Sequence, residues 1–210
     1  MNFDNLVSLT SDLPCFQTSY LSAGTSLPQV RLQLDRWEKA GKVIKIAKSV
    51  YTLAPPYIKI TPSPFAISAV LRPSSYISLH SALAFYGLIP EYVPATLALT
   101  TGRPWQIQSP CGRFVFRHIK PAFFSGYKQH AVDRQTCFIA TPEKALLDLL
   151  YMTSDSATSS FIESLRLQNC AQLNSKKLSA YAEQMKSKKI DRALALLLTF
   201  LNNHDEGYAL

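Results

Sequence analysis

The polar residues best suited to chemistry in this sequence lie close together, between positions 26 and 48. One set consists of Ser26, Gln29, Arg31, Gln33 and Arg36, and the other of Lys42, Lys45 and Lys48. Arginine can form paired bonds with guanine O6 and N7, and glutamine with adenine N6 and N7, whereas lysine binds phosphates without reading a base. The two sets therefore predict contact with double-stranded DNA, through bases in the first case and phosphates in the second.

The elements that would position these residues are a helix and a hairpin. Apolar residues recur at spacings of three and four, at Leu27, Val30, Leu34 and Trp37, which predicts an amphipathic helix with the first set outside. Ser26 can cap the start of this helix, and Gly41 can end it. Strand formers on both sides of Ala47–Ser49 then predict a hairpin that carries the three lysines. This is the outline of a winged helix-turn-helix, although lysines on a hairpin are often only a solvated surface.

The segments around this stretch complete the predicted organisation, an α+β fold in two domains. Short helices over 2–9 and 16–23 would finish a winged helix-turn-helix domain at residues 1–55. Four prolines between positions 54 and 64 predict a semi-rigid linker at 56–64. The remaining residues, 65–210, read as a mixed α/β domain that ends in a helical region, 152–210.

Within the second domain the sequence predicts both strands and helices. Strands are expected over 95–101, 113–119 and 135–140, with a loop between the first two. Helices are expected over 65–71, within 76–88 and over 141–151, 161–167, 175–185 and 190–201. Thr141 would cap the helix at 141–151, and the last helix is apolar on most sides, so we expect it to be buried.

Charge is spread unevenly along the chain, whose formal net charge is +8. Residues 1–60 carry seven basic and four acidic side chains, residues 61–140 carry seven and two, and residues 141–210 carry eight of each. A basic front and a neutral tail suit a protein that binds a polyanion at one end. The apolar fraction of 47% excludes a disordered chain.

Other polar residues allow a functional and a structural interpretation. Four residues of the second domain, Arg103, Arg113, Arg117 and His118, could extend a DNA footprint, contact RNA, or be ordinary exposed strand positions. Glu143 fits a partner of the helix dipole, and Lys144 with Asp148 fits an ion pair one helical turn apart, so we favour a structural role for all three. His80 and Tyr86, on a mainly apolar helix, are expected to be packed.

No metal, cofactor or membrane signal is readable. The four cysteines, Cys15, Cys111, Cys137 and Cys170, and the four histidines are scattered without the spacing of zinc ligands. No apolar run approaches the roughly 20 residues of a membrane span, and the N-terminus lacks the pattern of a secretory signal. We therefore expect a cytoplasmic protein with no metal and no cofactor.

Several motifs occur in an order that resembles one family. They are Gly41-Lys42-Val43 with Val50-Tyr51-Thr52-Leu53, then Tyr76-Ile77-Ser78 with Ser81-Ala82-Leu83 and Tyr86-Gly87-Leu88, then Thr100-Thr101 with Arg103-Pro104, then Phe114 and Phe116 to Ile119, and finally Ile139 to Asp148. This order resembles the AbiEi-type antitoxins, which are transcriptional regulators of viral defence, over roughly residues 1–151. Each motif is weak alone, whereas the ordered set is fairly specific. The family's turn has a glycine before the Val-Tyr pair, where this chain has Ser49.

The resemblance implies an antitoxin of a type IV toxin–antitoxin pair that acts in abortive infection against phage. Its winged helix would bind inverted repeats in its own promoter and repress transcription. Proteins that read such repeats often bind as two copies, although no dimer interface is readable in this sequence. The second domain would counter a nucleotidyltransferase-like toxin without forming a stable complex with it.

Two alternatives come from the residues themselves. The first is a winged-helix regulator whose second domain senses a ligand or dimerises, with no toxin partner. The second is an enzyme, which we disfavour because residues 61–140 contain only two acids, Glu91 and Asp133, and no phosphate-binding glycine loop is readable. We therefore expect no catalytic residues.

Overall fold

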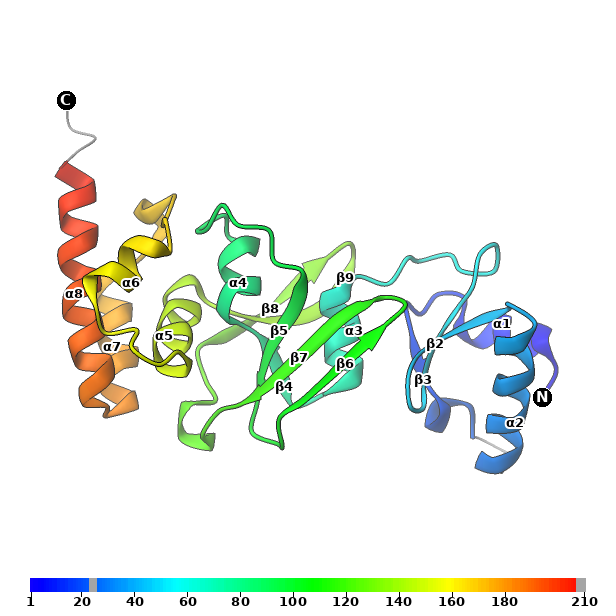
Figure 1. The fold of residues 1–210 in the computed structure, drawn as a ribbon. Helices are drawn as coiled ribbons and strands as arrows, with labels where there is room; N and C mark the ends of the chain where they lie inside the picture. The colour runs from blue at the N-terminus through cyan, green and yellow to red at the C-terminus, as the bar shows by residue number, and fades with distance from the viewer. Residues whose placement is uncertain (23–25, 207–210) are drawn as a thin grey trace.

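The computed structural model of the chain describes residues 1–22 and 26–206, with side chains described through residue 203. The described residues form a mixed α/β fold of eight α-helices and two sheets, within the predicted α+β class. Figure 1 shows an elongated molecule with the smaller sheet at one end, the larger sheet in the middle and the helices of the C-terminal part at the other end. In the described part of the chain, no helix is long and apolar enough to cross a membrane.

The N-terminal part contains a three-stranded antiparallel sheet in the order β1-β3-β2. Its elements are α1 (Phe3–Thr10), β1 (Phe16–Gln17), a 3₁₀ helix η1 (Thr18–Leu21), α2 (Leu27–Lys39), β2 (Val43–Ala47) and β3 (Val50–Leu53). Its core is made of Leu6, Phe16, Leu21, Val30, Leu34, Trp37, Val43, Tyr51 and Leu53. The predicted helix and hairpin are therefore confirmed, and α2 shares this core with Val43, Tyr51 and Leu53 of the hairpin.

Three expectations for this part are wrong. The predicted helix over 16–23 is instead a strand followed by a single 3₁₀ turn through residue 21, and residue 23 lies outside the described residues. Phe16 is in register with Tyr51 and stacks on it, so pairing with β3 outweighs the helical pattern. Leu27 is 40% exposed rather than inward, and Ser26 occupies the N-cap position without a capping hydrogen bond from its side chain.

The larger sheet has six strands in the order β6-β7-β5-β4-β9-β8. The strands are β4 (Ser75–Ile77), β5 (Ala95–Thr100), β6 (Trp105–Ser109), β7 (Gly112–His118), β8 (Tyr127–Val132) and β9 (Gln135–Ala140). The pairs β4–β9 and β5–β7 are parallel, and the other three pairs are antiparallel. The predicted strands became β5, β7 and β9, whereas β4, β6 and β8 were missed.

Three helices pack against β4, β5 and β9 of this sheet, and the helical part of the chain continues beyond it. The helices that follow the N-terminal part are α3 (Pro64–Leu71), α4 (Leu79–Phe85), α5 (Pro142–Met152), α6 (Ser159–Ser164), α7 (Ser175–Met185) and α8 (Lys188–Glu206), with 3₁₀ helices η2 (Pro121–Phe123) and η3 (Cys170–Gln172). The Thr141 hydroxyl caps α5 by accepting a hydrogen bond from the Lys144 amide, as predicted. The α8 helix is only partly buried, because Ala193 and Leu197 are inward whereas Leu194 and Leu196 are half-buried.

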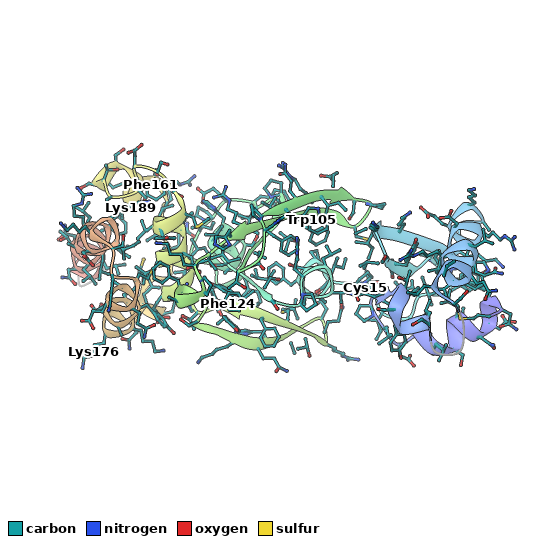
Figure 2. All side chains as sticks on the ribbon, turned by 90° about the horizontal axis from the view of Figure 1, so that it is seen from below. Cys15, Trp105, Phe124, Phe161, Lys176 and Lys189 are labelled. Carbon is teal, nitrogen blue, oxygen red and sulfur yellow. The ribbon has the colours of Figure 1, made fainter. Side chains whose placement is uncertain are left out.

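The two parts of the molecule share apolar surface. Cys15, Ile46, Ala47 and Val50 belong to the large apolar cluster of the six-stranded sheet rather than to the N-terminal core, and β2 contacts β6. In Figure 2, Cys15 lies where the N-terminal part meets the rest of the chain. One side of the β2–β3 hairpin is therefore packed against the second half of the protein.

The end of the proline-rich segment between the two parts is hydrogen-bonded to the side chain of Gln135. The Gln135 amide donates to the Thr61 carbonyl at 2.9 Å, and its oxygen accepts from the Ser63 amide at 3.0 Å. Ser63 in turn caps α3 by accepting from the Ala66 amide. The predicted boundary at 56–64 stays a prediction, but the segment is anchored at its end rather than free.

Candidate functional site

A groove of about 540 Å³ lies between α2 and the β2–β3 hairpin. It is lined by Thr18, Pro28, Arg31, Leu32, Asp35, Lys45, Lys48, Ser49 and Tyr51. Three of these residues are basic and exposed, and one is acidic. The groove brings together three of the residues selected from the sequence: Arg31, Lys45 and Lys48.

The end of α2 places the hairpin beside it. Val30, Leu34 and Trp37 fix the helix in the N-terminal core. Gly41 adopts a φ of +68°, and the Lys42 amide donates to the Trp37 carbonyl at 2.8 Å, a Schellman-type helix end. The chain therefore reverses at once, and the strand that carries Lys45 runs back along the helix.

The tip of the hairpin closes with Ser49 in the position where the resembled family has glycine. Ser49 has a φ of +68°, a left-handed conformation that favours glycine. Its carbonyl accepts a hydrogen bond from the Thr18 amide at 2.9 Å, which ties the tip to η1. The hairpin is thus kept with serine at this position, and Lys48 stays exposed at the tip.

The other residues predicted for this surface point elsewhere. A helix turns by roughly 100° per residue, so Gln29, Gln33 and Arg36 lie on the flank of α2 away from Arg31. Gln29 and Arg36 are exposed, and Gln33 is half-buried. Ser26 is exposed before the first turn of α2. The Lys42 ammonium lies 4.6 Å from the centre of the Phe3 ring, so it faces α1 and not the groove.

The charge of the groove is positive, and nearby carboxylates partly offset it. The Lys45 ammonium lies 4.0 Å from a Glu38 carboxylate oxygen and 5.9 Å from the centre of the Tyr51 ring. Burial raises the pKa of Tyr51, and nearby Lys45 partly opposes this rise. Among the described residues, Arg31 and Lys48 take part in no ion pair. Both charges are therefore available to an anionic ligand.

Sequence reasoning missed several residues that line the groove. Leu32 is 53% exposed and Asp35 is exposed, on the same side of α2 as Arg31. The spacing along α2 is the signal that predicts them, because positions 28, 31, 32 and 35 share one helical face. Asp35 bears most on which ligand the groove could accept. Its carboxylate would repel a phosphate and would favour an amine donor such as that of a base.

The basic residues selected in the second half fall in two places. Arg113 and Arg117 lie on one face of β7, alternating with the buried Phe114 and Phe116, and Arg113 donates to the Gln106 amide oxygen at 3.3 Å. His118 Nδ1 lies 3.0 Å from the carbonyl of Gly102, which precedes Arg103 in the β5–β6 loop. All four side chains are exposed.

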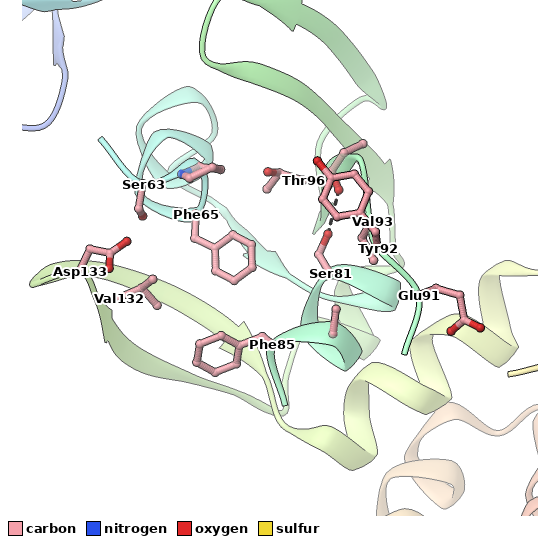
Figure 3. Close-up of a pocket in the computed structure, with 13 residues that line it drawn as sticks. Ser63, Phe65, Ser81, Phe85, Glu91, Tyr92, Val93, Thr96, Val132 and Asp133 are labelled. Carbon is pink, nitrogen blue, oxygen red and sulfur yellow. Dashed lines mark hydrogen bonds between the residues drawn. The ribbon is translucent and has the colours of Figure 1, made fainter. Parts of the chain in front are cut away.

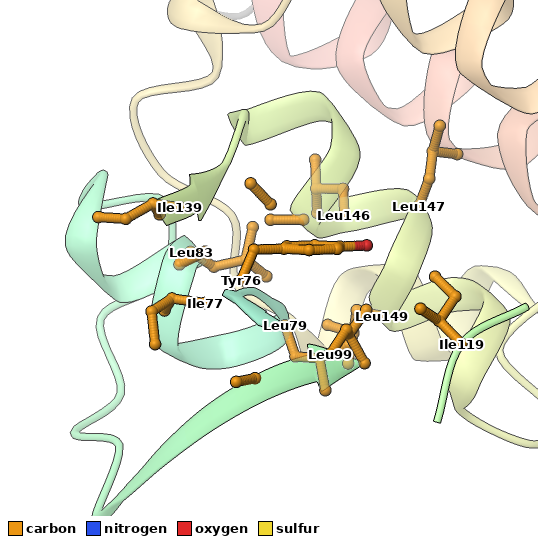
Figure 4. Close-up of a cluster of buried hydrophobic side chains, with 14 of the residues drawn as sticks. Tyr76, Ile77, Leu79, Leu83, Leu99, Ile119, Ile139, Leu146, Leu147 and Leu149 are labelled. Carbon is orange, nitrogen blue, oxygen red and sulfur yellow. The ribbon is translucent and has the colours of Figure 1, made fainter. Parts of the chain in front are cut away.

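A buried polar network ties β4 to α5. The predicted ion pair of Lys144 with Asp148 is confirmed, and Asp148 also accepts hydrogen bonds from Ser78 at 2.8 Å and from Tyr76 at 3.1 Å. Lys144 also donates to the Tyr76 hydroxyl at 3.1 Å. In Figure 4 the Tyr76 ring lies among apolar side chains, including Leu83 and Leu146.

Burial controls the ionisation of this network. Burial raises the pKa of Asp148 and lowers that of Lys144, and each partner's charge opposes the shift of the other. Burial, followed by the Asp148 charge, also raises the pKa of Tyr76. Because every member is at most 2% exposed, the network is internal to the fold and offers no atom to a ligand.

Glu143 differs from its predicted role in one respect. It lies in the first turn of α5 as expected, but it is buried, and its Oε1 accepts a hydrogen bond from the Asn174 amide at 3.2 Å. It therefore also links α5 to the start of α7. In the described part of the chain, its Oε2 is one of two buried side-chain nitrogen or oxygen atoms without a hydrogen-bond partner.

The remaining residues singled out from the sequence are packed or half-buried. The Tyr86 hydroxyl lies 3.2 Å from His130 Nε2, and burial raises the pKa of Tyr86 to about 12. Burial, and then Cys111, raise the pKa of the Cys15 thiol to about 12. Within the described residues, no cluster of three or more His, Cys, Asp or Glu side chains could hold a metal ion.

Comparisons with known proteins define the fold and nothing finer. No protein-family model matches the chain, and no curated protein matches its sequence. A solved structure, the RV2827C protein from Mycobacterium tuberculosis, is similar with a TM-score of 0.59 and 12% sequence identity. The match covers 92% of this chain and 75% of that one. At this identity the likeness concerns the arrangement of the backbone alone.

Proposed function

We propose that the protein is a DNA-binding repressor of its own promoter, with a winged helix-turn-helix at residues 1–55. The observation that carries this proposal is the groove that combines Arg31 of α2 with Lys45 and Lys48 of the hairpin. A helix that reads the major groove and a basic hairpin that holds phosphates need this combination. Arg31 is assigned to a base, and the two lysines are assigned to the backbone.

The proposal narrows the DNA-contacting set that the sequence suggested. Arg31, Lys45 and Lys48 form its centre. Gln29, Gln33 and Arg36 lie on the other flank of α2 and Ser26 precedes its first turn, so these four are not needed for the assignment. Lys42 is left out because its ammonium rests on the Phe3 ring. Arg103, Arg113, Arg117 and His118 are not needed for the assignment.

The proposal includes an antitoxin role for the second half, counteracting a nucleotidyltransferase-like toxin of a type IV system. This part is supported by the ordered motifs from Tyr76 to Asp148 that resemble the AbiEi-type antitoxins. The competing function is a winged-helix regulator with a ligand-sensing or dimerising second domain and no toxin. A nucleotidyltransferase encoded beside this chain, whose toxicity the chain relieves on co-expression, separates the two.

The first experiment is a salt titration of binding to the DNA upstream of the protein's own gene, compared with scrambled DNA of equal length. A preference of about 10³-fold or more for the upstream DNA is the expected result, at the low end for specific binders. Equal affinity for both, with a steep fall as salt rises, would reduce the groove to a non-specific basic surface and contradict the repressor assignment.

A further inference from the structure

A second groove, of about 520 Å³, lies between α3, α4 and the β8–β9 turn (Figure 3). It is lined by Ser63, Pro64, Phe65, Ser81, Ala84, Phe85, Glu91, Tyr92, Val93, Ala95, Thr96, Val132 and Asp133. Phe65 and Phe85 lie with ring centres 6.0 Å apart. Phe85 is 40% exposed and Tyr92 is 88% exposed, so the groove offers aromatic surface to solvent.

The distribution of acids sets this groove apart from its surroundings. Glu91 and Asp133 are the only acidic residues between positions 61 and 140, and both line the groove. Figure 3 shows them at opposite ends, with the two phenylalanines between them. The negative charge of an otherwise basic region is therefore concentrated at the two ends of an apolar groove.

Both carboxylates are accessible to an incoming cation. Asp133 is exposed and forms no ion pair within the described residues. Glu91 meets the Arg166 guanidinium at 3.4 Å, but both side chains are exposed, and an ion pair of this kind contributes little. An arginine or lysine from a ligand can take the place of Arg166 at little cost.

Two serine hydroxyls in the wall already have hydrogen-bond partners, and Ser63 accepts from the Ala66 amide. The Ser81 hydroxyl donates to the Ala95 carbonyl at 3.0 Å and accepts from the Leu97 amide at 2.9 Å. Recognition in this groove therefore depends on the aromatic floor and the two carboxylates. Nucleic acid does not suit it, because phosphates would be repelled at both ends.

We propose that this groove docks a basic peptide segment of a partner protein. A large apolar side chain of the segment would pack on Phe65 and Phe85, and flanking Lys or Arg residues would meet Glu91 and Asp133. Acids at opposite ends of the groove suit an extended peptide, which can carry basic residues on both sides of an apolar anchor. Aromatic anchors surrounded by charge complementarity are typical of such interfaces. The inference does not depend on DNA binding by the N-terminal groove.

The test begins with selection of a randomised 12-residue peptide library on the full-length protein without DNA. Selected peptides are then synthesised with a fluorophore and titrated by anisotropy. We expect a consensus of one aromatic or long aliphatic residue flanked by Lys or Arg. We also expect about tenfold weaker binding to the isosteric double variant Glu91→Gln with Asp133→Asn. Glu183→Gln, an exposed acid on α7 outside the groove, is the matched control and keeps full affinity.

Four results would overturn the proposal. They are no enriched peptide, an acidic consensus, full affinity in both the double variant and Phe85→Ala, and dissociation of a dimer by Phe85→Ala without peptide, which would make a second copy the occupant. Binding to upstream DNA is measured on the same variants and should be unchanged. Failure of the DNA assay and failure of the peptide assay are therefore distinguishable.

Discussion

Lysine serves opposite purposes in two regions of this molecule. In the groove beside α2, Lys45 and Lys48 are exposed, and the one ion pair there, between Lys45 and Glu38, is long and solvated. In the network between β4 and α5, Lys144 is 2% exposed and bonds to a carboxylate and a phenol. Exposed charges contribute little to folding and remain free for ligands, whereas buried charges must be paired in place. The burial of a lysine side chain therefore indicates its role in this molecule better than its residue type does.

The largest effect is expected at the buried network. Asp148→Ala leaves the Lys144 ammonium buried without its counter-charge, which should lower the free energy of unfolding by about 3–5 kcal/mol. Urea denaturation followed by circular dichroism measures this loss. The double variant Lys144→Met with Asp148→Leu is the control and should recover much of the stability. A loss below about 1 kcal/mol for Asp148→Ala would mean that the network is not the structural tie described above.

The next effect concerns base recognition by α2. Arg31→Ala should reduce the preference for upstream over scrambled DNA by about 1–3 kcal/mol, because a bidentate base contact is lost. Competition binding at fixed salt measures the preference. Arg36→Ala, on the other flank of the same helix, is the matched control and should change the preference less. Equal weakening on both DNAs by Arg31→Ala would contradict the base assignment.

A smaller and uniform effect is expected at the hairpin tip. Lys48→Ala should weaken binding to every sequence alike and reduce the slope of log K against log salt by about 1, since one phosphate contact is removed. Binding isotherms at several salt concentrations give the slope. Lys42→Ala should leave it unchanged because that ammonium faces Phe3. Equal slopes for Lys48→Ala and the unmodified protein would remove the hairpin from the interface.

The smallest effect is expected at His80, which is half-buried and so lies between the exposed lysines of the groove and the buried Lys144 in its exposure. Burial and then Arg117 lower its pKa from 6.5, while Glu91 partly opposes them. The unfolded chain therefore takes up this proton at a higher pH than the native chain does. The stability that neutral His80 contributes is complete above about pH 6.5 and is lost as the pH falls through the lower native pKa. Unfolding free energies between pH 7.5 and 5 should fall less steeply for His80→Gln; an unchanged slope would assign the pH dependence to other groups.

How far the sequence predicts this structure depends on how local each signal is. The α2 helix and the β2–β3 hairpin follow from short-range periodicity and turn residues, and the Thr141 cap and the Lys144–Asp148 pair follow from spacing along one helix. Strand β4 has three buried residues and no alternation, so Tyr76 reads as the start of the next helix. Strand β6 does alternate, with Trp105 and Ile107 apolar, but the nearby Gly102 and Pro104 predict a loop.

The candidate site shows the same division. The sequence predicts which residues are polar on α2, but only the packing of the hairpin decides which flank faces it. Arg31 and Lys45 line one groove because β2 folds back along the helix, whereas the Lys42 ammonium lies over the Phe3 ring of α1. Such choices depend on contacts between elements, which spacing along one element does not encode.

The packing of the β2–β3 hairpin against β6 limits how this protein can evolve. Ile46, Ala47 and Val50 face the second half of the chain, so the N-terminal part carries an apolar strip that only a matching partner covers. Recombination at the proline-rich segment would join this strip to an unrelated surface and leave its apolar side chains exposed to solvent. The two halves are therefore expected to be inherited together rather than exchanged as separate modules.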